Sequence, residues 1–181
     1  MNKKARRQLE KLFSIPKCLI YKIMGFGRVK ISGSQRWERG AVLHAEGGNV
    51  FIGNKCNFRT GVHIRALGGV LRIGDFVFAN NNVSITAFNK ITIGNHVKLA
   101  NNVVIVDHDH DYMNGNEGYK VGSVVIEDGV WVGANSVILR DTHIGKNCVI
   151  AAGSVVKGNL PDNTVWGTRL AAQIKEFDPI S

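Results

Sequence analysis

The sequence predicts an all-β solenoid of about six coils, built from short strands and tight turns. The main observation is a period of six, because aliphatic residues occupy every sixth position in the second half of the chain. A helix would repeat its apolar face about every 3.6 residues and a half-buried strand about every two, so this period indicates one short strand and one turn per hexad. The aliphatic positions are Ile126, Val132, Ile138, Ile144, Ile150 and Val156.

The same period extends upstream in sets of three hexads. The sets begin at residues 31, 52, 73, 93, 126 and 144, with separations of 21, 21, 20, 33 and 18 residues. Three hexads make 18 residues, so the early coils carry small corner insertions and the fourth coil carries a large one. Glycine often directly follows the hexad aliphatic, where a tight corner favours a residue without Cβ. These glycines are Gly53, Gly74, Gly94, Gly133 and Gly145.

Length and cysteine content are those of a single intracellular domain. A chain of 181 residues can bury a substantial core as one domain. Cys56 and Cys148 both occupy the inward small position of a hexad, which predicts buried thiols rather than a disulfide. Three cysteines, with no secretory signal and no apolar run of membrane-span length, indicate the cytoplasm.

The basic charge is confined to the N-terminal segment. The net charge is +9, and residues 1–30 hold nine Lys and Arg against Glu10 alone, which leaves +1 for the remaining chain. The repeats show no basic surface interleaved with aromatic residues, so we expect no nucleic acid partner.

Residues 3–24 predict two short amphipathic helices interrupted at Pro16. One interpretation is a cap over the open end of the solenoid, which repeat proteins need for solubility. The other is a peripheral contact of residues 1–24 with an anionic membrane surface, which would place the protein at the inner face of the membrane. Trp37 and Phe58 stand where aliphatic residues are expected, so we expect a wide first coil packed against these helices.

The hexad motif resembles that of the hexapeptide-repeat acyltransferases over residues 29–168. The resemblance implies a left-handed parallel β-helix of triangular section, acetyl-CoA as acyl donor, no metal, and a homotrimer with its sites between subunits. It also implies an acceptor hydroxyl on a sugar or glycan precursor. We expect a helical segment at 1–28, a catalytic β-helix at 29–168 with a loop at 111–123, and a short C-terminal helix and tail at 169–181.

A histidine cluster closes the fourth coil, in the segment Val106-Asp-His-Asp-His-Asp-Tyr112. An aperiodic stretch rich in Gly and Asn follows, and a long loop that interrupts a regular solenoid usually carries function. Acyl transfer needs a base that is neutral near pH 7, which suits histidine. In the resembling family the base closes the coil before the extended loop, which corresponds to His108, with His110 as the alternative. No Ser or Cys nucleophile adjoins His108, so we expect direct transfer without an acyl-enzyme.

A metal site is the main alternative for this cluster. Alternation along a strand sends His108 and His110 to one face and the three aspartates, Asp107, Asp109 and Asp111, to the other, leaving two ligands per chain. The γ-class carbonic anhydrases share the fold and bind zinc through three histidines, with a ligand spacing that this segment does not reproduce. A zinc hydratase, a non-catalytic scaffold and an N-acetyltransferase of an amino sugar nucleotide all stay open.

The resemblance also implies residues that bind the two substrates. Asn82 matches the acceptor-facing Asn of the sugar O-acetyltransferases, but Ala87 and Phe88 replace the acidic residues that follow it there. The C-terminal turn also departs from the family pattern, because Leu170 stands where a proline is usual. We expect the remaining acceptor contacts from His110, Tyr112 and Glu117. We expect coenzyme contacts from Trp131, Ala151, Gly153, Ser154, Lys157 and Arg169.

Overall fold

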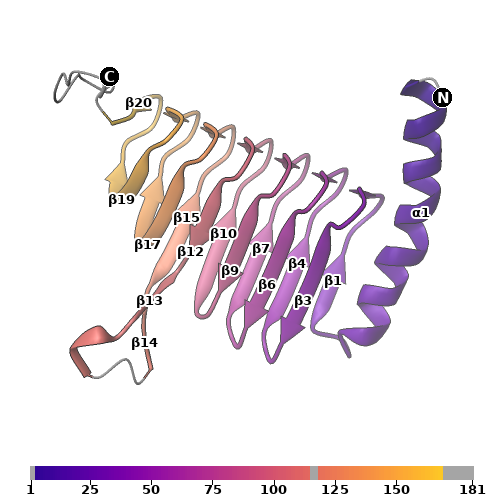
Figure 1. The fold of residues 1–181 in the computed structure, drawn as a ribbon, viewed down its shortest axis with the longest axis horizontal. Coiled ribbons are helices and arrows are strands. Elements are labelled where there is room, and N and C mark those ends of the chain that lie inside the picture. The colour runs from indigo at the N-terminus through magenta and orange to yellow at the C-terminus, as the bar shows by residue number, and fades with distance from the viewer. Residues whose placement is uncertain (1–2, 115–117, 169–181) are drawn as a thin grey trace, which may run out of the picture.

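The computed structural model describes residues 3–114 and 118–168, and it is a parallel β-solenoid of about six turns. Figure 1 shows the coils stacked in one row, with a helix at the N-terminal end and a hairpin projecting near the other end. The fold predicted from the hexad period is therefore confirmed, and it agrees with a left-handed β-helix. The expected C-terminal helix lies outside the described residues.

Each coil contributes one strand to each of three faces, and strands of successive coils pair in parallel. The first face holds β1 (Val29–Ile31), β4 (Asn49–Ile52), β7 (Val70–Ile73), β10 (Lys90–Ile93) and β15 (Ser123–Ile126). The second face holds β2 (Arg36–Trp37), β5 (Asn57–Phe58), β8 (Phe78–Ala79), β11 (Lys98–Leu99), β16 (Trp131–Val132), β18 (Val149–Ile150) and β20 (Val165–Trp166). The third face holds β3 (Val42–Glu46), β6 (His63–Leu67), β9 (Ser84–Ala87) and β12 (Val104–Val106).

The last two coils lack an insertion at the corner between the third and first faces. There β17 (Val137–Ile144) and β19 (Val155–Leu160) continue around the corner, and their pairing is irregular between Ile138 and Thr142. In the fourth coil the same corner carries β13 (His108–His110), a 3₁₀ turn η1 (Tyr112–Asn114) and β14 (Tyr119–Val121). We call this position, in every coil, the third corner.

The hexad aliphatics point into the prism and form one continuous core. Cys56 and Cys148 are buried and free, as predicted. Each thiol donates to a carbonyl of the next coil: Cys56 Sγ to Gly74 O at 3.1 Å and Cys148 Sγ to Pro161 O at 3.0 Å. These small inward residues thus donate hydrogen bonds to backbone carbonyl groups at the corners, and their size leaves room for the aliphatic side chains of the core.

An asparagine ladder lines the corner between the second and third faces, which we call the second corner. Asn82, Asn102 and Asn135 have φ values of 59°, 60° and 59°. Asn82 Nδ2 donates to Asn102 Oδ1 at 3.2 Å, and Asn102 Nδ2 donates to Asn135 Oδ1 at 2.9 Å. Asparagine is well suited here because it tolerates a left-handed backbone conformation and offers both a donor and an acceptor.

One helix, α1 (Lys3–Met24), replaces the two helices predicted from Pro16. Proline removes one helical hydrogen bond, but contacts with the first coil hold the helix on both sides of it. Before Pro16, Ser14 Oγ accepts a hydrogen bond from Trp37 N at 2.9 Å. After it, Tyr21 Oη accepts one from Leu43 N at 3.3 Å. Tertiary contacts therefore outweigh the local cost of proline.

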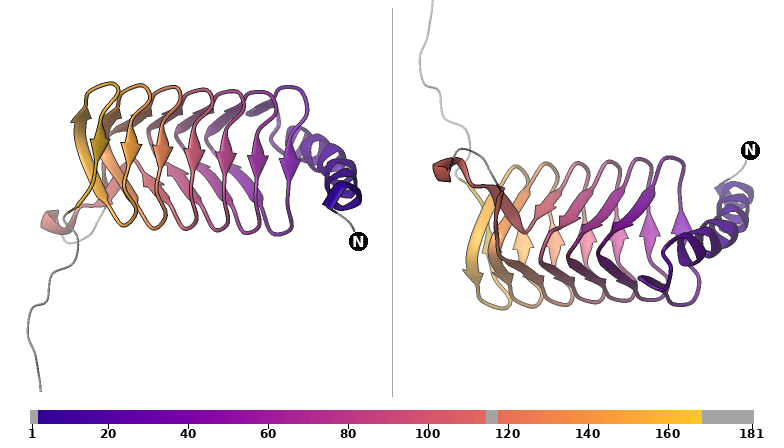
Figure 2. Two further views of the ribbon diagram at one scale, coloured as in Figure 1. Left: turned by 90° about the horizontal axis from the view of Figure 1, so that it is seen from above. Right: turned by 90° about the horizontal axis from the view of Figure 1, so that it is seen from below.

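The helix covers the N-terminal end of the solenoid, as Figure 2 shows from above and below. Trp37 and Phe58 are buried beneath it, with ring centroids 4.4 Å apart, and Tyr21 lies 5.3 Å from Trp37. The aromatic residues in the first two coils are therefore buried in the core and pack against the helix, as expected. Within the described part of the chain, no helix has the length and apolar character needed to cross a membrane.

Candidate active site

The histidine cluster lies at the third corner, where the chain leaves the solenoid as an antiparallel hairpin. Strands β13 and β14 pair His108 with Val121 and His110 with Tyr119. Two hydrogen bonds close the base of the hairpin, from Gly122 N to Asp107 O at 2.7 Å and from Asn89 Nδ2 to Gly122 O at 2.6 Å. The first histidine is therefore fixed at the rigid base rather than at the tip.

A buried carboxylate holds His108 in place. Asp107 is 0% exposed; its Oδ1 accepts from Phe88 N at 2.8 Å and its Oδ2 accepts from Asn89 N at 2.9 Å. Asp107 Oδ1 also lies 3.4 Å from His108 Nδ1. In the tautomer that donates Nδ1–H to this carboxylate, Nε2 keeps a lone pair and can accept a proton.

Aromatic rings surround the imidazole of His108. Its centroid lies 4.0 Å from that of Phe88 and 5.5 Å from that of Tyr119, the latter at an interplanar angle of 81°. The His110 ring lies 4.8 Å from Tyr119. The side chain of His108 retains 16% exposure, so solvent or a substrate can reach it.

Asp109 points away from the two histidines, as strand alternation predicts, but Asp107 does not follow this prediction, because it precedes β13 and its carboxylate lies beside His108. Asp109 Oδ2 accepts from Arg140 Nε at 2.6 Å, and this hydrogen bond is the main cause of a raised pKa for Arg140. Lys120 Nζ lies 3.0 Å from Asp111 Oδ1. The pair of Asp109 with Arg140 connects the hairpin to the next coil. The pair of Lys120 with Asp111 links the two sides of the hairpin.

The other predicted site residues are spread over different parts of the solenoid. Lys157 is exposed at the third corner, and Tyr112 is exposed in η1. Asn82 lies in the asparagine ladder of the second corner, where Ala151, Gly153 and Ser154 also lie. Trp131 is 52% exposed on the second face. One chain therefore brings neither Asn82 nor the coenzyme candidates of the second corner and second face together with His108.

Glu117 and Arg169 lie outside the described residues.

Three neighbours of the histidine cluster were not among the predicted site residues: Phe88, Tyr119 and Arg140. Phe88 precedes His108 by 20 residues, which is one coil of the local repeat, so the period could have placed it there. Tyr119 and Arg140 carried no such signal, because Tyr119 belongs to the aperiodic loop and Arg140 is placed by an irregular corner.

Among the described residues, no three His, Cys, Asp or Glu side chains are grouped closely enough to hold a metal ion.

Sequence comparison connects this geometry to known transferases. Residues 123–158 match the family model "Bacterial transferase hexapeptide (six repeats)". A relative from Escherichia coli K12, named "Putative lipopolysaccharide biosynthesis O-acetyl transferase WbbJ", is 34% identical over 137 residues, covering 67% of this chain and 70% of its own. The galactoside O-acetyltransferase of Lactococcus lactis is 35% identical over 122 residues, covering 65% of this chain and 58% of its own.

Solved structures agree with these sequence relatives. A hexapeptide-repeat acetyltransferase from Vibrio cholerae, crystallised with acetyl coenzyme A, superposes with a TM-score of 0.58 at 32% identity, covering 69% of this chain and 71% of its own. The N-acyltransferase AntD of Bacillus cereus gives a TM-score of 0.67 at 20% identity, covering 87% of each chain, which shows the shared fold alone. The chain therefore belongs to the hexapeptide-repeat transferase family, and within that family it is an acetyltransferase.

Proposed function

We propose that this protein transfers the acetyl group of acetyl-CoA to a sugar hydroxyl of a glycan or glycan precursor. The observation that carries the proposal is the buried Asp107 beside His108 at the base of the hairpin, since it leaves one imidazole nitrogen available as a base. The Escherichia coli and Lactococcus lactis relatives bear the names of O-acetyltransferases, and the Vibrio cholerae structure holds acetyl coenzyme A.

His108 acts as general base in this mechanism. Its Nε2 takes the proton of the acceptor hydroxyl, whose oxygen attacks the thioester carbonyl carbon. Backbone amides stabilise the resulting oxyanion. As the tetrahedral intermediate collapses, the carbon–sulfur bond breaks and the imidazolium returns its proton to the departing coenzyme A sulfur. Asp107 holds Nδ1–H throughout and stabilises the imidazolium.

The acceptor binds along the hairpin in this proposal. Phe88, Tyr119 and His110 offer aromatic surface beside His108, and Tyr119 and His110 remain exposed. Sugar rings present apolar C–H faces that can pack on such rings, while Tyr112 and Glu117 supply polar groups farther along the loop. Asn82 lies at the second corner, so in this proposal it contributes a further amide to the acceptor from a neighbouring subunit.

The donor binds between subunits of a homotrimer. His108 lies at the third corner, whereas Trp131 lies on the second face and Ser154 at the second corner, so a neighbouring subunit must supply the second set. Trp131 packs against the coenzyme, the amides of the second corner hold the pantetheine arm, and Lys157 and Arg169 bind its phosphates. The donor set is Trp131, Ala151, Gly153, Ser154, Lys157 and Arg169.

We propose that the protein acts in the cytoplasm, at the inner face of the membrane. Glycan precursors and acetyl-CoA meet there, and the basic N-terminal segment of residues 1–24 would contact the anionic lipid surface.

The test is thiol release from acetyl-CoA with a panel of sugars, amino sugars and sugar nucleotides. We expect release that requires a hydroxyl acceptor, is insensitive to a chelator, and is lost in His108→Ala. His143→Ala is a matched control, because His143 lies on the outer surface of β17 with its Nε2 3.1 Å from Glu127 Oε1.

Release only with amino sugars would replace the O-transfer proposal with N-transfer. Loss of activity on chelation would favour a zinc hydratase. An unchanged rate in His108→Ala would refute the assigned base.

A further inference from the structure

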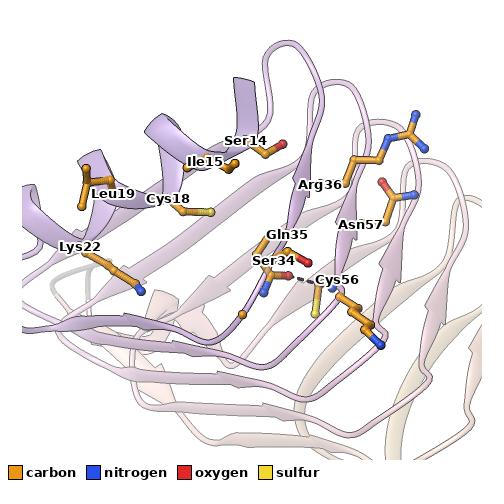
Figure 3. Close-up of a pocket in the computed structure, with 12 residues that line it drawn as sticks. Ser14, Ile15, Cys18, Leu19, Lys22, Ser34, Gln35, Arg36, Cys56 and Asn57 are labelled. Carbon is orange, nitrogen blue, oxygen red and sulfur yellow. Dashed lines mark hydrogen bonds between the residues drawn. The ribbon is translucent and has the colours of Figure 1, made fainter. Parts of the chain in front are cut away.

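A pocket lies between α1 and the corner that joins the first and second faces in the first two coils (Figure 3). Its volume is about 780 Å³, which is within the range of about 300–1,000 Å³ typical of small-molecule sites. Cys18 and Lys22 extend from the helix toward the side formed by Ser34, Gln35 and Cys56. The elements that line the pocket, α1 and the first two coils, lie toward the opposite end of the solenoid from the hairpin (Figure 1).

The helix side of this pocket is mainly apolar and continues into an exposed apolar surface. Ile15, Cys18 and Leu19 line the pocket together with Ser14 and Lys22, and the hydroxyl groups of Ser14 and Tyr21 bond the first coil. The large apolar side chains exposed on this helix and just after it are Ile15, Leu19, Ile20, Ile23, Met24 and Phe26. Contiguous exposed apolar surface of this kind usually marks a site of interaction with a protein or a membrane.

The rim of the pocket carries positive charge. Lys22 and Lys55 are exposed at its edge, and Lys55 Nζ lies 5.2 Å from the Phe76 ring. The buried Glu38 nearby is neutralised by Arg36 at 3.1 Å and Arg59 at 2.9 Å. Lys22 is one of the nine basic residues of the segment 1–30, which holds one acidic residue, and Lys55 adds a further positive charge.

We propose that this pocket binds one anionic phospholipid of a membrane surface. The acyl chain lies against Ile15, Cys18 and Leu19, and the phosphate lies between Lys22 and Lys55. The exposed apolar side chains of α1 enter the membrane interface beside this lipid. The enzyme then works with one end of its solenoid on the lipid surface. This binding does not depend on the acetyl-transfer chemistry, so its test can fail independently of the proposed function.

The test uses the full chain and dihexanoyl phosphatidylglycerol, a short-chain lipid that stays monomeric. We expect saturable binding by calorimetry, with at least tenfold weaker binding of dihexanoyl phosphatidylcholine and no binding of inorganic phosphate. Lys22→Gln and Lys55→Gln should each weaken binding about fivefold. Cys18→Trp, which fills the pocket, should abolish it.

Lys146→Gln is the matched control, because Lys146 occupies the same corner at the far end of the solenoid. It should bind the lipid as the wild type does. Circular dichroism and thiol release by Cys18→Trp should match the wild type, which separates loss of the pocket from misfolding. Equal affinity for the two lipids, binding of phosphate alone, or undiminished binding by a folded Cys18→Trp would each overturn the proposal.

Discussion

Replacing Asp107 by Asn tests the link between the fold and the chemistry. The wild-type carboxylate is fully buried and accepts two backbone hydrogen bonds, from Phe88 at 2.8 Å and Asn89 at 2.9 Å. An amide has one acceptor oxygen, so one backbone N–H would face the new NH₂ group. The lost charged hydrogen bond and the unpaired donor should together reduce the free energy of unfolding by about 2–4 kcal/mol. Urea denaturation followed by circular dichroism measures this change.

The same variant should slow catalysis beyond its effect on stability. Without the carboxylate, His108 loses the group that fixes its tautomer and stabilises its imidazolium, which we expect to lower kcat by about 10²–10⁴. The KM for acetyl-CoA should stay unchanged, since the fully buried Asp107 offers no surface to the donor. Steady-state thiol release below the unfolding midpoint gives both constants.

Asp109→Asn is the control for Asp107, because Asp109 is one strand position beyond His108 and pairs with Arg140 at 2.6 Å on the other side. It should keep kcat within about threefold of the wild type. The assignment of Asp107 as a positioning residue would be wrong if its Asn variant kept full kcat, or if Asp109→Asn lost as much.

Three further predictions concern the core, a buried thiol and the acceptor surface. Phe58→Ala removes a fully buried ring from beneath Trp37, so we expect it to lower the free energy of unfolding by about 3–5 kcal/mol. Phe78→Ala is the control, because Phe78 is partly exposed, and it should lower the same quantity by about 1 kcal/mol. Urea denaturation measures both changes. Burial raises the pKa of the Cys56 thiol to about 11, so at pH 7.5 its thiolate population should be about 100-fold below that in the unfolded chain. Mass spectrometry after iodoacetamide treatment should find Cys56 alkylated only on unfolding, and fast alkylation of the folded protein would contradict this. Tyr119→Ala should raise the KM for the acceptor about twofold to tenfold and leave that for acetyl-CoA unchanged, whereas equal changes in both would exclude a contact with the acceptor.

The solenoid could be predicted because its repeat is encoded residue by residue. Each aliphatic residue at the hexad position points into the same core, so the period alone identified the strands and their order. The N-terminal helix was predicted less accurately, as two helices rather than one. Proline in the middle of α1 indicates a break by local rules, but Ser14 and Tyr21 bind the first coil on either side, and such contacts between distant segments leave no periodic signal.

The candidate site was predictable in part for the same reason. The loop after the fourth coil was visible as an interruption of the period. Strand alternation correctly separated His108 and His110 from Asp109, but it wrongly separated Asp107 from His108, because Asp107 precedes the strand. The aromatic contacts around the two histidines could not be predicted. Tyr119 approaches His110 across a hairpin, and the sequence does not specify the register of that hairpin.

Thiol release by mixed trimers tests whether the site around His108 is shared between two subunits. His108→Ala and Trp131→Ala each impair the site alone, and the two residues lie at different places on one chain. If each site takes His108 from one subunit and Trp131 from its neighbour, random mixing in equal amounts restores about one quarter of the wild-type sites. A site shared between subunits should therefore give activity near that fraction from two nearly inactive parents. Activity no higher than the average of the two parents would contradict it.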